Sequence, residues 1–144
     1  MNAAIMAAAN RGVRVEVTVS SACSFGKPSP SEVRTLTSIF TAFDQAGITS
    51  TMFTKNIKIN GIAGYLHAKA IVIDGKHAWM GSVNGSTQAL TRNREFGIFF
   101  DTLNDVSKLS QILTSDHSDL NGESWQDSLD CAETHTSSKR ALLD

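Results

Sequence analysis

The chain has 144 residues and a formal net charge of −1, with 41% hydrophobic and 19% charged residues, 10 Gly and 2 Pro. This length suits one domain with a hydrophobic core and is too short for two ordinary domains. The composition excludes a disordered, collagen-like or repetitive chain. Because no run of about 18 apolar residues occurs, it also excludes a transmembrane helix.

The first predicted elements are a helix and a strand. Residues 2–10 are rich in Ala, and Gly12 stands where a left-handed residue often ends a helix. Valine at every second position of residues 13–19 predicts a half-buried strand. The start lacks the basic residues and the hydrophobic stretch of a signal peptide. A helix ahead of the first strand either begins the fold or packs on an earlier strand, which another part of a longer protein would supply.

A second predicted helix begins after Ser29. Ser29 as the N-cap, Pro30 at the first helical position and Glu32 three residues after the cap form the pattern of a capping box. Gly47 is expected to end this helix. Apolar residues at helical spacing indicate the face that packs on the core, and they are Val33, Leu36, Phe40 and Phe43.

Short strands follow this helix. The dipeptide Asp74-Gly75 is a strong signal for a hairpin turn between two of them. The alternation of helices and strands indicates an α/β layered domain. The predicted strands cover residues 48–53, 57–59, 66–73, 78–80 and 94–100.

The C-terminal part contains one more predicted helix and a tail. Thr102 and Asp105 have the spacing that caps a helix, and apolar residues follow at helical spacing. From about Ser115 the chain is polar and acidic, and we expect an irregular or partly ordered tail. The sequence therefore predicts a domain at residues 1–114 and a tail at residues 115–144. The apolar residues of the helix are Val106, Leu109, Ile112 and Leu113.

Charge is unevenly distributed between these parts. Residues 1–100 contain 10 Lys and Arg against 5 Asp and Glu, a balance of +5, whereas residues 101–144 contain 3 against 9, a balance of −6. The positive part can attract an anionic substrate, although an unevenly charged solvated surface explains the same counts. Cys23 and Cys131 form either one bridge or two free thiols, so the compartment stays open. The 30 Ser and Thr residues are compatible with a secreted protein.

Polar residues gather around the predicted hairpin. His67 and Lys69 are two positions apart on an apolar predicted strand, so both side chains leave the same face. Burying them without partners is costly, which indicates a use for them. Ser82 and Asn84 follow the return strand, and Glu95 starts another strand that can approach the same place. Singly, each is explained by a packed histidine or a turn residue, but together they indicate a site.

These residues resemble a known signature. The spacing His67-x-Lys69-x4-Asp74-x6-Gly81-Ser82-x-Asn84 is similar to the HKD motif of the phospholipase D superfamily, which includes phospholipases, phospholipid synthases and small endonucleases. The flanking segments, residues 8–15 and Asn93-Arg94-Glu95-Phe96, also resemble the family pattern. The resemblance covers roughly residues 3–113. It implies an α/β fold in which helices flank a mixed β-sheet, as one half of a phospholipase D-like fold.

The resemblance also implies roles for the site residues. His67 would attack phosphorus and form a phosphohistidine, or act as the general acid. Lys69 and Asn84 would bind the phosphoryl oxygens, with a further hydrogen bond from Ser82. The two carboxylates would position other residues and would not contact the phosphate. Glu95 would orient the histidine, and Asp74 would hold the geometry of the motif. No metal or other cofactor is expected, and His77, His117 and His135 are interpreted as surface residues.

The sequence contains one motif, whereas family active sites contain two. We therefore expect a second motif-bearing chain or half, either a partner from the same precursor, with this chain as its C-terminal half, or a second copy in a homodimer. Three functions stay open. The first is cleavage of phospholipid head-group esters by hydrolysis or transphosphatidylation, which implies contact with a membrane surface and is favoured by the apolar loop at residues 62–65. The second is a homodimeric endonuclease, against which stands the lack of a basic stripe with interleaved aromatic residues. The third is a non-catalytic half of a larger assembly, against which stands the intact motif.

Overall fold

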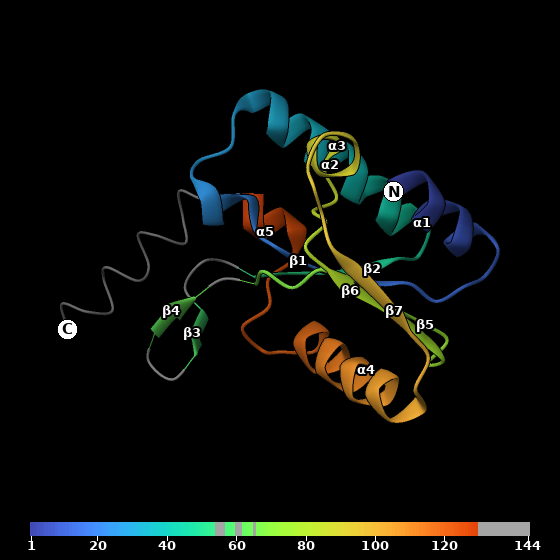
Figure 1. Ribbon diagram of the computed structural model, residues 1–144. Coiled ribbons are helices and arrows are strands. Elements are labelled where there is room, and N and C mark those ends of the chain that lie inside the picture. The colour runs from blue at the N-terminus through green and yellow to red at the C-terminus, as the bar shows by residue number, and fades with distance from the viewer. Residues whose placement is uncertain (54–56, 60–61, 65, 130–144) are drawn as a thin grey trace. The chain divides into compact units, whose positions relative to one another are not determined.

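The computed structural model describes residues 1–53, 57–59, 62–64 and 66–129 (Figure 1). These residues form two units, which are described separately below. The catalytic-motif unit contains Met1 and His67–Asp116. The parallel-strand unit contains the residues of Asn2–Leu66 and the chain from His117 onward.

The parallel-strand unit is built on strands β1 and β2. Strand β1 (Glu16–Ser20) pairs in parallel with β2 (Thr49–Phe53), with Glu16 opposite Thr49. Valines of the first strand pack toward the core as their alternation predicts, but the strand begins three residues later than expected, and Val13 is 45% exposed. The unit also contains α1 (Asn2–Asn10), the short 3-10 helix η1 (Ala22–Phe25), α2 (Pro30–Gln45), β3 (Ile57–Ile59), β4 (Ile62–Gly64) and α5 (Trp125–Leu129).

Helix α2 begins as the sequence predicts. The Ser29 hydroxyl accepts a hydrogen bond from the Glu32 backbone N–H, and the Glu32 carboxylate accepts one from the Ser29 N–H at 2.7 Å. These bonds hold the pKa of Glu32 below its ordinary value. Gly47 follows the helix with φ of +72°, a conformation that glycine adopts without strain. The capping box is therefore confirmed.

The core of this unit lies between α2 and the parallel strands. Phe40 and Phe43 of the predicted apolar stripe are buried and pack edge to face, with ring centroids 5.6 Å apart. Ile48 and Met52 complete the buried cluster. Partly buried apolar residues from α1, β1 and α2 surround it, among them Ile5, Val17 and Leu36.

Two segments of the parallel-strand unit differ from the sequence expectation. Residues 62–64 are not a loop, because β4 pairs with β3 in an antiparallel hairpin, whereas residue 65 lies outside the described residues. The expected tail is structured between His117 and Leu129. Glu123 exchanges backbone hydrogen bonds with Met52, and the Trp125 ring stacks on Phe40 at 6.1 Å. Both segments are short; β4 is stabilised by pairing with its neighbour β3, and the 117–129 segment by packing on distant residues.

The catalytic-motif unit contains a three-stranded antiparallel sheet. Its order is β5 (Ala70–Ile73), β6 (His77–Gly81) and β7 (Gly97–Phe100), with α3 (Thr87–Thr91) in the connection after β6. Helix α4 (Leu103–His117) lies alongside this sheet (Figure 1). The mixed α/β architecture that the sequence predicts is thus confirmed, with parallel and antiparallel pairing both present.

The turn between β5 and β6 forms where Asp74-Gly75 predicts it. Both residues have positive φ, +53° for Asp74 and +62° for Gly75, and the Lys76 N–H donates to the Ile73 carbonyl at 3.0 Å. Asp is one of the few residues other than Gly that adopts this region readily. This turn fixes the register that sets Ile73 opposite His77.

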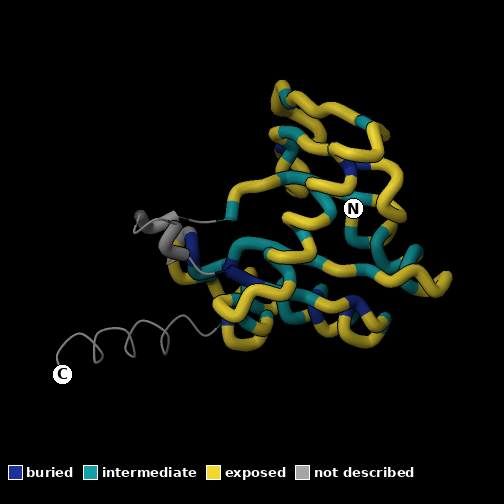
Figure 2. Tube along the Cα trace, turned by 90° about the horizontal axis from the view of Figure 1, so that it is seen from below, coloured by how far each residue is buried: buried dark blue, intermediate teal, exposed yellow. Residues whose placement is uncertain are grey.

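Burial differs from the sequence expectation in the last helix. Val106 is fully buried, but Ile112, which was expected on the apolar face, is 57% exposed. Among the described residues, the buried hydrophobic set has eight members, of which only Ala78, Ala89 and Val106 belong to the catalytic-motif unit. Exposed and partly exposed residues accordingly predominate along the trace in Figure 2. This unit therefore has a small core of its own.

Candidate active site

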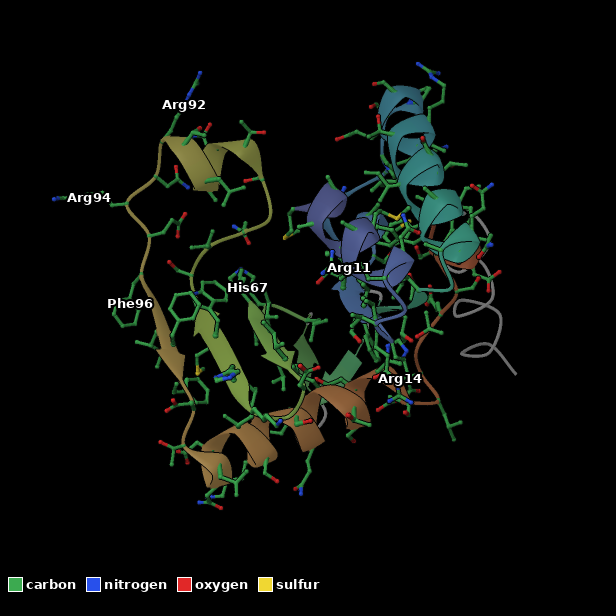
Figure 3. The ribbon with its side chains drawn as sticks, turned by 90° about the vertical axis from the view of Figure 1, so that its right-hand side faces the viewer. Arg11, Arg14, His67, Arg92, Arg94 and Phe96 are labelled. Carbon is green, nitrogen blue, oxygen red and sulfur yellow. The ribbon has the colours of Figure 1, made fainter. Side chains whose placement is uncertain are left out.

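His67 and Lys69 lie directly before strand β5, not on it. The strand begins at Ala70, four residues after the predicted start, so the expectation that both residues belong to a strand is wrong. The ladder nevertheless continues to Lys69, because the Gly81 N–H donates to the Lys69 carbonyl at 3.0 Å. The Lys69 ammonium donates to the His67 carbonyl oxygen at 2.9 Å. His67 is exposed, and Figure 3 shows it at one end of the hairpin.

Ser82 joins the end of β6 to the start of β7. Its backbone N–H donates to the Phe96 carbonyl at 2.8 Å, and its hydroxyl oxygen accepts from the Phe96 N–H at 3.0 Å. The same hydroxyl donates to a Glu95 carboxylate oxygen at 2.5 Å. The hydroxyl proton of Ser82 is therefore directed at Glu95.

Glu95 is held at both carboxylate oxygens. One accepts from Ser82, and the other accepts from the Asn93 amide at 3.0 Å. The Ser82 bond, then the Asn93 bond, hold the pKa of Glu95 below its ordinary value; desolvation opposes them, and the positive charge of Lys69 adds the smallest lowering contribution. Glu95 is thus an oriented carboxylate beside the lysine of the motif. The sequence places it on a strand, but β7 begins two residues later.

Glycines allow β7 to approach this closely. A Cβ atom on Gly81 would collide with the Phe96 carbonyl oxygen, and one on Gly97 would lie 2.6 Å from the indole nitrogen of Trp79. Gly97, Trp79 and Asn93 were not among the predicted site residues. Asn93 was detectable from its spacing of two from Glu95, whereas no local pattern indicated the contact of Trp79 with the glycines.

The other motif residues lie apart from this cluster. Asp74 is exposed in the turn at the opposite end of β5 from Lys69. Asn84 is exposed in the loop between β6 and α3. The structure therefore brings together His67, Lys69, Ser82 and Glu95 at the edge of the sheet where β5 begins, β6 ends and β7 begins. Asn84 lies two residues after Ser82. Asp74 is not part of this cluster.

Two basic residues and one aromatic residue lie beside Glu95 in the chain. Arg92, Arg94 and Phe96 are exposed, Phe96 to 68%, and Figure 3 shows both arginine side chains pointing away from the site. This short segment is not the basic stripe with interleaved aromatic residues whose lack the sequence showed, but its groups can contact phosphates and an unpaired base.

The histidines outside the motif differ from one another. His77 is exposed, as expected, and His135 lies outside the described residues. His117 is not an isolated surface residue, because its ring nitrogens contact the hydroxyls of Thr18 at 3.1 Å and Thr49 at 3.0 Å. It therefore links β1 to β2 within the parallel-strand unit.

A metal site, a membrane-spanning helix and a free thiol would each need other residues than those of the motif. In the described part of the chain, no three His, Cys, Asp or Glu residues gather as a metal site would require. Within the same residues, no helix has both the length and the apolar character to span a bilayer. Cys23 is not a free thiol, and Cys131 lies outside the described residues.

The motif in the sequence and the family comparison agree. Residues 1–117 match the family model described as cardiolipin synthase, PLD-like domain. The chain belongs to the phospholipase D superfamily. Members of this superfamily are phosphodiesterases.

The fold is similar to that of a solved superfamily structure. This is Nuc from Salmonella typhimurium, described as a phospholipase D family member, with a TM-score of 0.62 and 18% sequence identity. The similarity covers 85% of this chain and 71% of the Nuc chain. It confirms the phospholipase D-like fold. A search of curated protein sequences finds no match.

Proposed function

We propose that this chain is a phospholipase D-type enzyme that cleaves the head-group ester of a phospholipid through a phosphohistidine, with water or an alcohol as the acceptor. The observation that carries the proposal is the Glu95 carboxylate, oriented by bonds from Ser82 and Asn93, together with Lys69, whose ammonium donates to the His67 carbonyl oxygen. An exposed histidine, a cation and a fixed carboxylate are the groups that a metal-independent phosphoryl transfer needs.

The proposed reaction has two displacements. An imidazole nitrogen of His67 forms a bond to phosphorus as the bond to the leaving alcohol breaks, and the alcohol oxygen takes a proton from a second histidine. Water or an alcohol then attacks phosphorus, gives its proton to that second histidine, and releases His67. Lys69 and Asn84 stabilise the charge on the phosphoryl oxygens in both steps.

Glu95 and Ser82 act in this proposal by positioning other groups. Because the Ser82 proton is donated to Glu95, the serine holds the carboxylate in place and does not donate to phosphate in this arrangement. The Lys69 ammonium is held by its bond to the His67 carbonyl oxygen, and its positive charge interacts weakly with the Glu95 carboxylate. Asp74, at the far turn, fixes the hairpin register through its positive φ.

A second histidine has to come from a second motif, because the sequence contains one HKD motif. We propose that another chain or half supplies it, either a partner from the same precursor or a second copy. Native mass spectrometry distinguishes these sources. An active chain that stays strictly monomeric without a partner would contradict the shared site.

The test of the proposed function compares two substrates. We expect release of the head group from phosphatidylcholine vesicles and no cleavage of single-stranded DNA. Both assays use the chain bound to the second motif-bearing chain or half. His67→Ala is the control, since it should abolish release without changing the unfolding temperature. If neither substrate is turned over, the proposed enzymatic activity on both substrates is wrong.

An endonuclease is the second candidate, because of one specific observation. Arg92, Arg94 and Phe96 are exposed beside Glu95 and have the chemistry to hold a single strand through its phosphates and a base. Cleavage of DNA without head-group release, weakened by substitution of both arginines, would favour this function over the first.

A further inference from the structure

One face of the sheet in the catalytic-motif unit contains an apolar groove of about 380 Å³. Large hydrophobic side chains on it are unusually exposed, with Ile71 at 50%, Ile73 at 55% and Phe99 at 84%. Soluble domains rarely leave several such residues together in water unless something binds there. We call this surface the sheet groove, and its principal lining residues are Ile71, Ile73, Trp79, Val83, Leu90 and Phe99.

The strand register places the sheet groove next to the catalytic motif. Ile71, Trp79 and Phe99 lie opposite one another across the three strands and so share one face. The neighbouring row on that face consists of Lys69, Gly81 and Gly97. The Gly81 N–H donates to the Lys69 carbonyl, and Gly97 lies opposite Gly81 on β7. Rows on one face are about 7 Å apart along a strand.

The glycine row between the groove and the motif is covered by the indole of Trp79, because the glycines have no side chains of their own. Gly81 and Gly97 have no side chains, and the indole of Trp79 lies over both, within 2.9 Å of where a Cβ on either would be. Apolar surface therefore extends from the groove up to the row of Lys69. Asn84, an expected phosphate-binding residue, also lines the groove.

The chemistry of the lining selects one kind of ligand. No Lys, Arg, Asp or Glu is among the described residues that line the sheet groove, although His77 and Met1 also line it. A polynucleotide needs a series of cations along its path, which one histidine does not supply. A hydrocarbon chain needs only apolar surface, and each methylene that it buries there is favourable.

We propose that the sheet groove binds the hydrocarbon chain of the substrate, an acyl chain of a phospholipid whose phosphate lies at Lys69 and Asn84. This inference rests on the proposed function and makes it more specific, since it assigns the lipid part of the substrate to a defined surface. The chain would run from the glycine row along Ile71 toward Ile73.

The test measures binding, so it does not depend on turnover. The probes are inorganic phosphate and a series of n-alkyl phosphates below their micellar concentrations, titrated into the full chain by calorimetry. We expect affinity to rise by about two- to fourfold for each added methylene over the first several members. An affinity independent of chain length would overturn the inference.

A matched pair of substitutions locates the binding surface. Ile73 in the groove and Ile112 on α4 are almost equally exposed, at 55% and 57%, and Ile112 does not line the groove. Ile73→Asn should remove most of the chain-length dependence and leave the affinity for inorganic phosphate unchanged, whereas Ile112→Asn should change neither. Equal effects of the two substitutions would contradict the assignment.

Two outcomes separate this inference from its alternatives. If Ile73→Asn dissociates a dimer and the unsubstituted chain shows no chain-length dependence, the groove is an interface with a second copy and the inference is wrong. If alkyl phosphates bind as expected while phosphatidylcholine is not cleaved, the groove assignment holds and the proposed catalytic function fails.

Discussion

The two units of this chain differ in what their side chains are used for. The parallel-strand unit buries aromatic and aliphatic residues from a well-capped helix, including Phe43 at 3% exposure and Met52 at 2%. The catalytic-motif unit buries little, exposes one apolar sheet face and places its polar residues at strand ends. The contrast teaches that the stability and the chemistry of this chain depend on different sets of residues.

The largest effect should come from the motif itself. His67→Ala should lower turnover by more than about a thousandfold, because the attacking nitrogen is lost. Its free energy of unfolding should stay close to that of the unsubstituted chain, since His67 is exposed. Enzyme assays and chemical denaturation on the same preparation measure both. A large loss of stability would show that the histidine is structural.

The next effect tests the core of the other unit. Phe43→Ala should lower the free energy of unfolding by about 3 to 5 kcal/mol, because it leaves a cavity beside Phe40. Phe99→Ala is the matched control, since Phe99 is 84% exposed and should cost far less. Denaturant titration measures the difference. Comparable losses for the two substitutions would remove the contrast between the units.

A smaller effect is expected at the start of α2. Ser29→Ala removes the hydroxyl that accepts from the Glu32 N–H and should cost about 1 kcal/mol of stability. Ser38→Ala is the control within the same helix, because Ser38 is exposed and caps nothing. It should be neutral or slightly stabilising, as Ala has the higher helix propensity. Thermal unfolding of the two variants in parallel gives the comparison.

The smallest effect concerns pH. Folding lowers the pKa of Glu95, so its ionised form contributes stability that is present above its ordinary value of 4.5 and is lost as the pH falls through the lower folded-state pKa. Glu95→Gln should remove this part of the acid dependence, measured by unfolding at a series of pH values below about 5.

Two comparisons make the pH result specific. Glu32→Gln should remove a separate contribution of the same sign, because Ser29 also lowers the pKa of Glu32. Only Glu95→Gln should also lower turnover, since Glu95 lies beside Lys69. If both variants alter turnover equally, the position of Glu95 has no special role.

Local sequence signals predicted the elements whose determinants lie within a few residues. The capping box at Ser29, the positive φ at Asp74 and the helix at residues 2–10 all depend on near neighbours. Strand ends were less predictable. His67, Lys69 and Glu95 have strand-like patterns, but the paired strands begin only at Ala70 and Gly97, since pairing depends on the partner strand.

Long-range contacts were beyond the sequence argument. Trp125 packs on Phe40 across 85 positions, and His117 bonds to Thr18 across 99. Neither has a local pattern, which is why the segment at residues 117–129 was expected to be irregular. The bond from Ser82 to Glu95 joins residues 13 apart and depends on the close approach that Gly81 and Gly97 allow.

The sequence by itself determined the family, the mixed α/β class and the identity of the motif residues, because residue type and spacing are properties of the chain alone. Only the tertiary structure decided that Ser82 directs its proton to Glu95, that Asp74 lies away from the motif cluster, and that an apolar groove lies on one face of the three-stranded sheet. The physical reason is that hydrogen bonds and exposed faces arise from pairing between strands, and pairing is set by register that no single segment encodes.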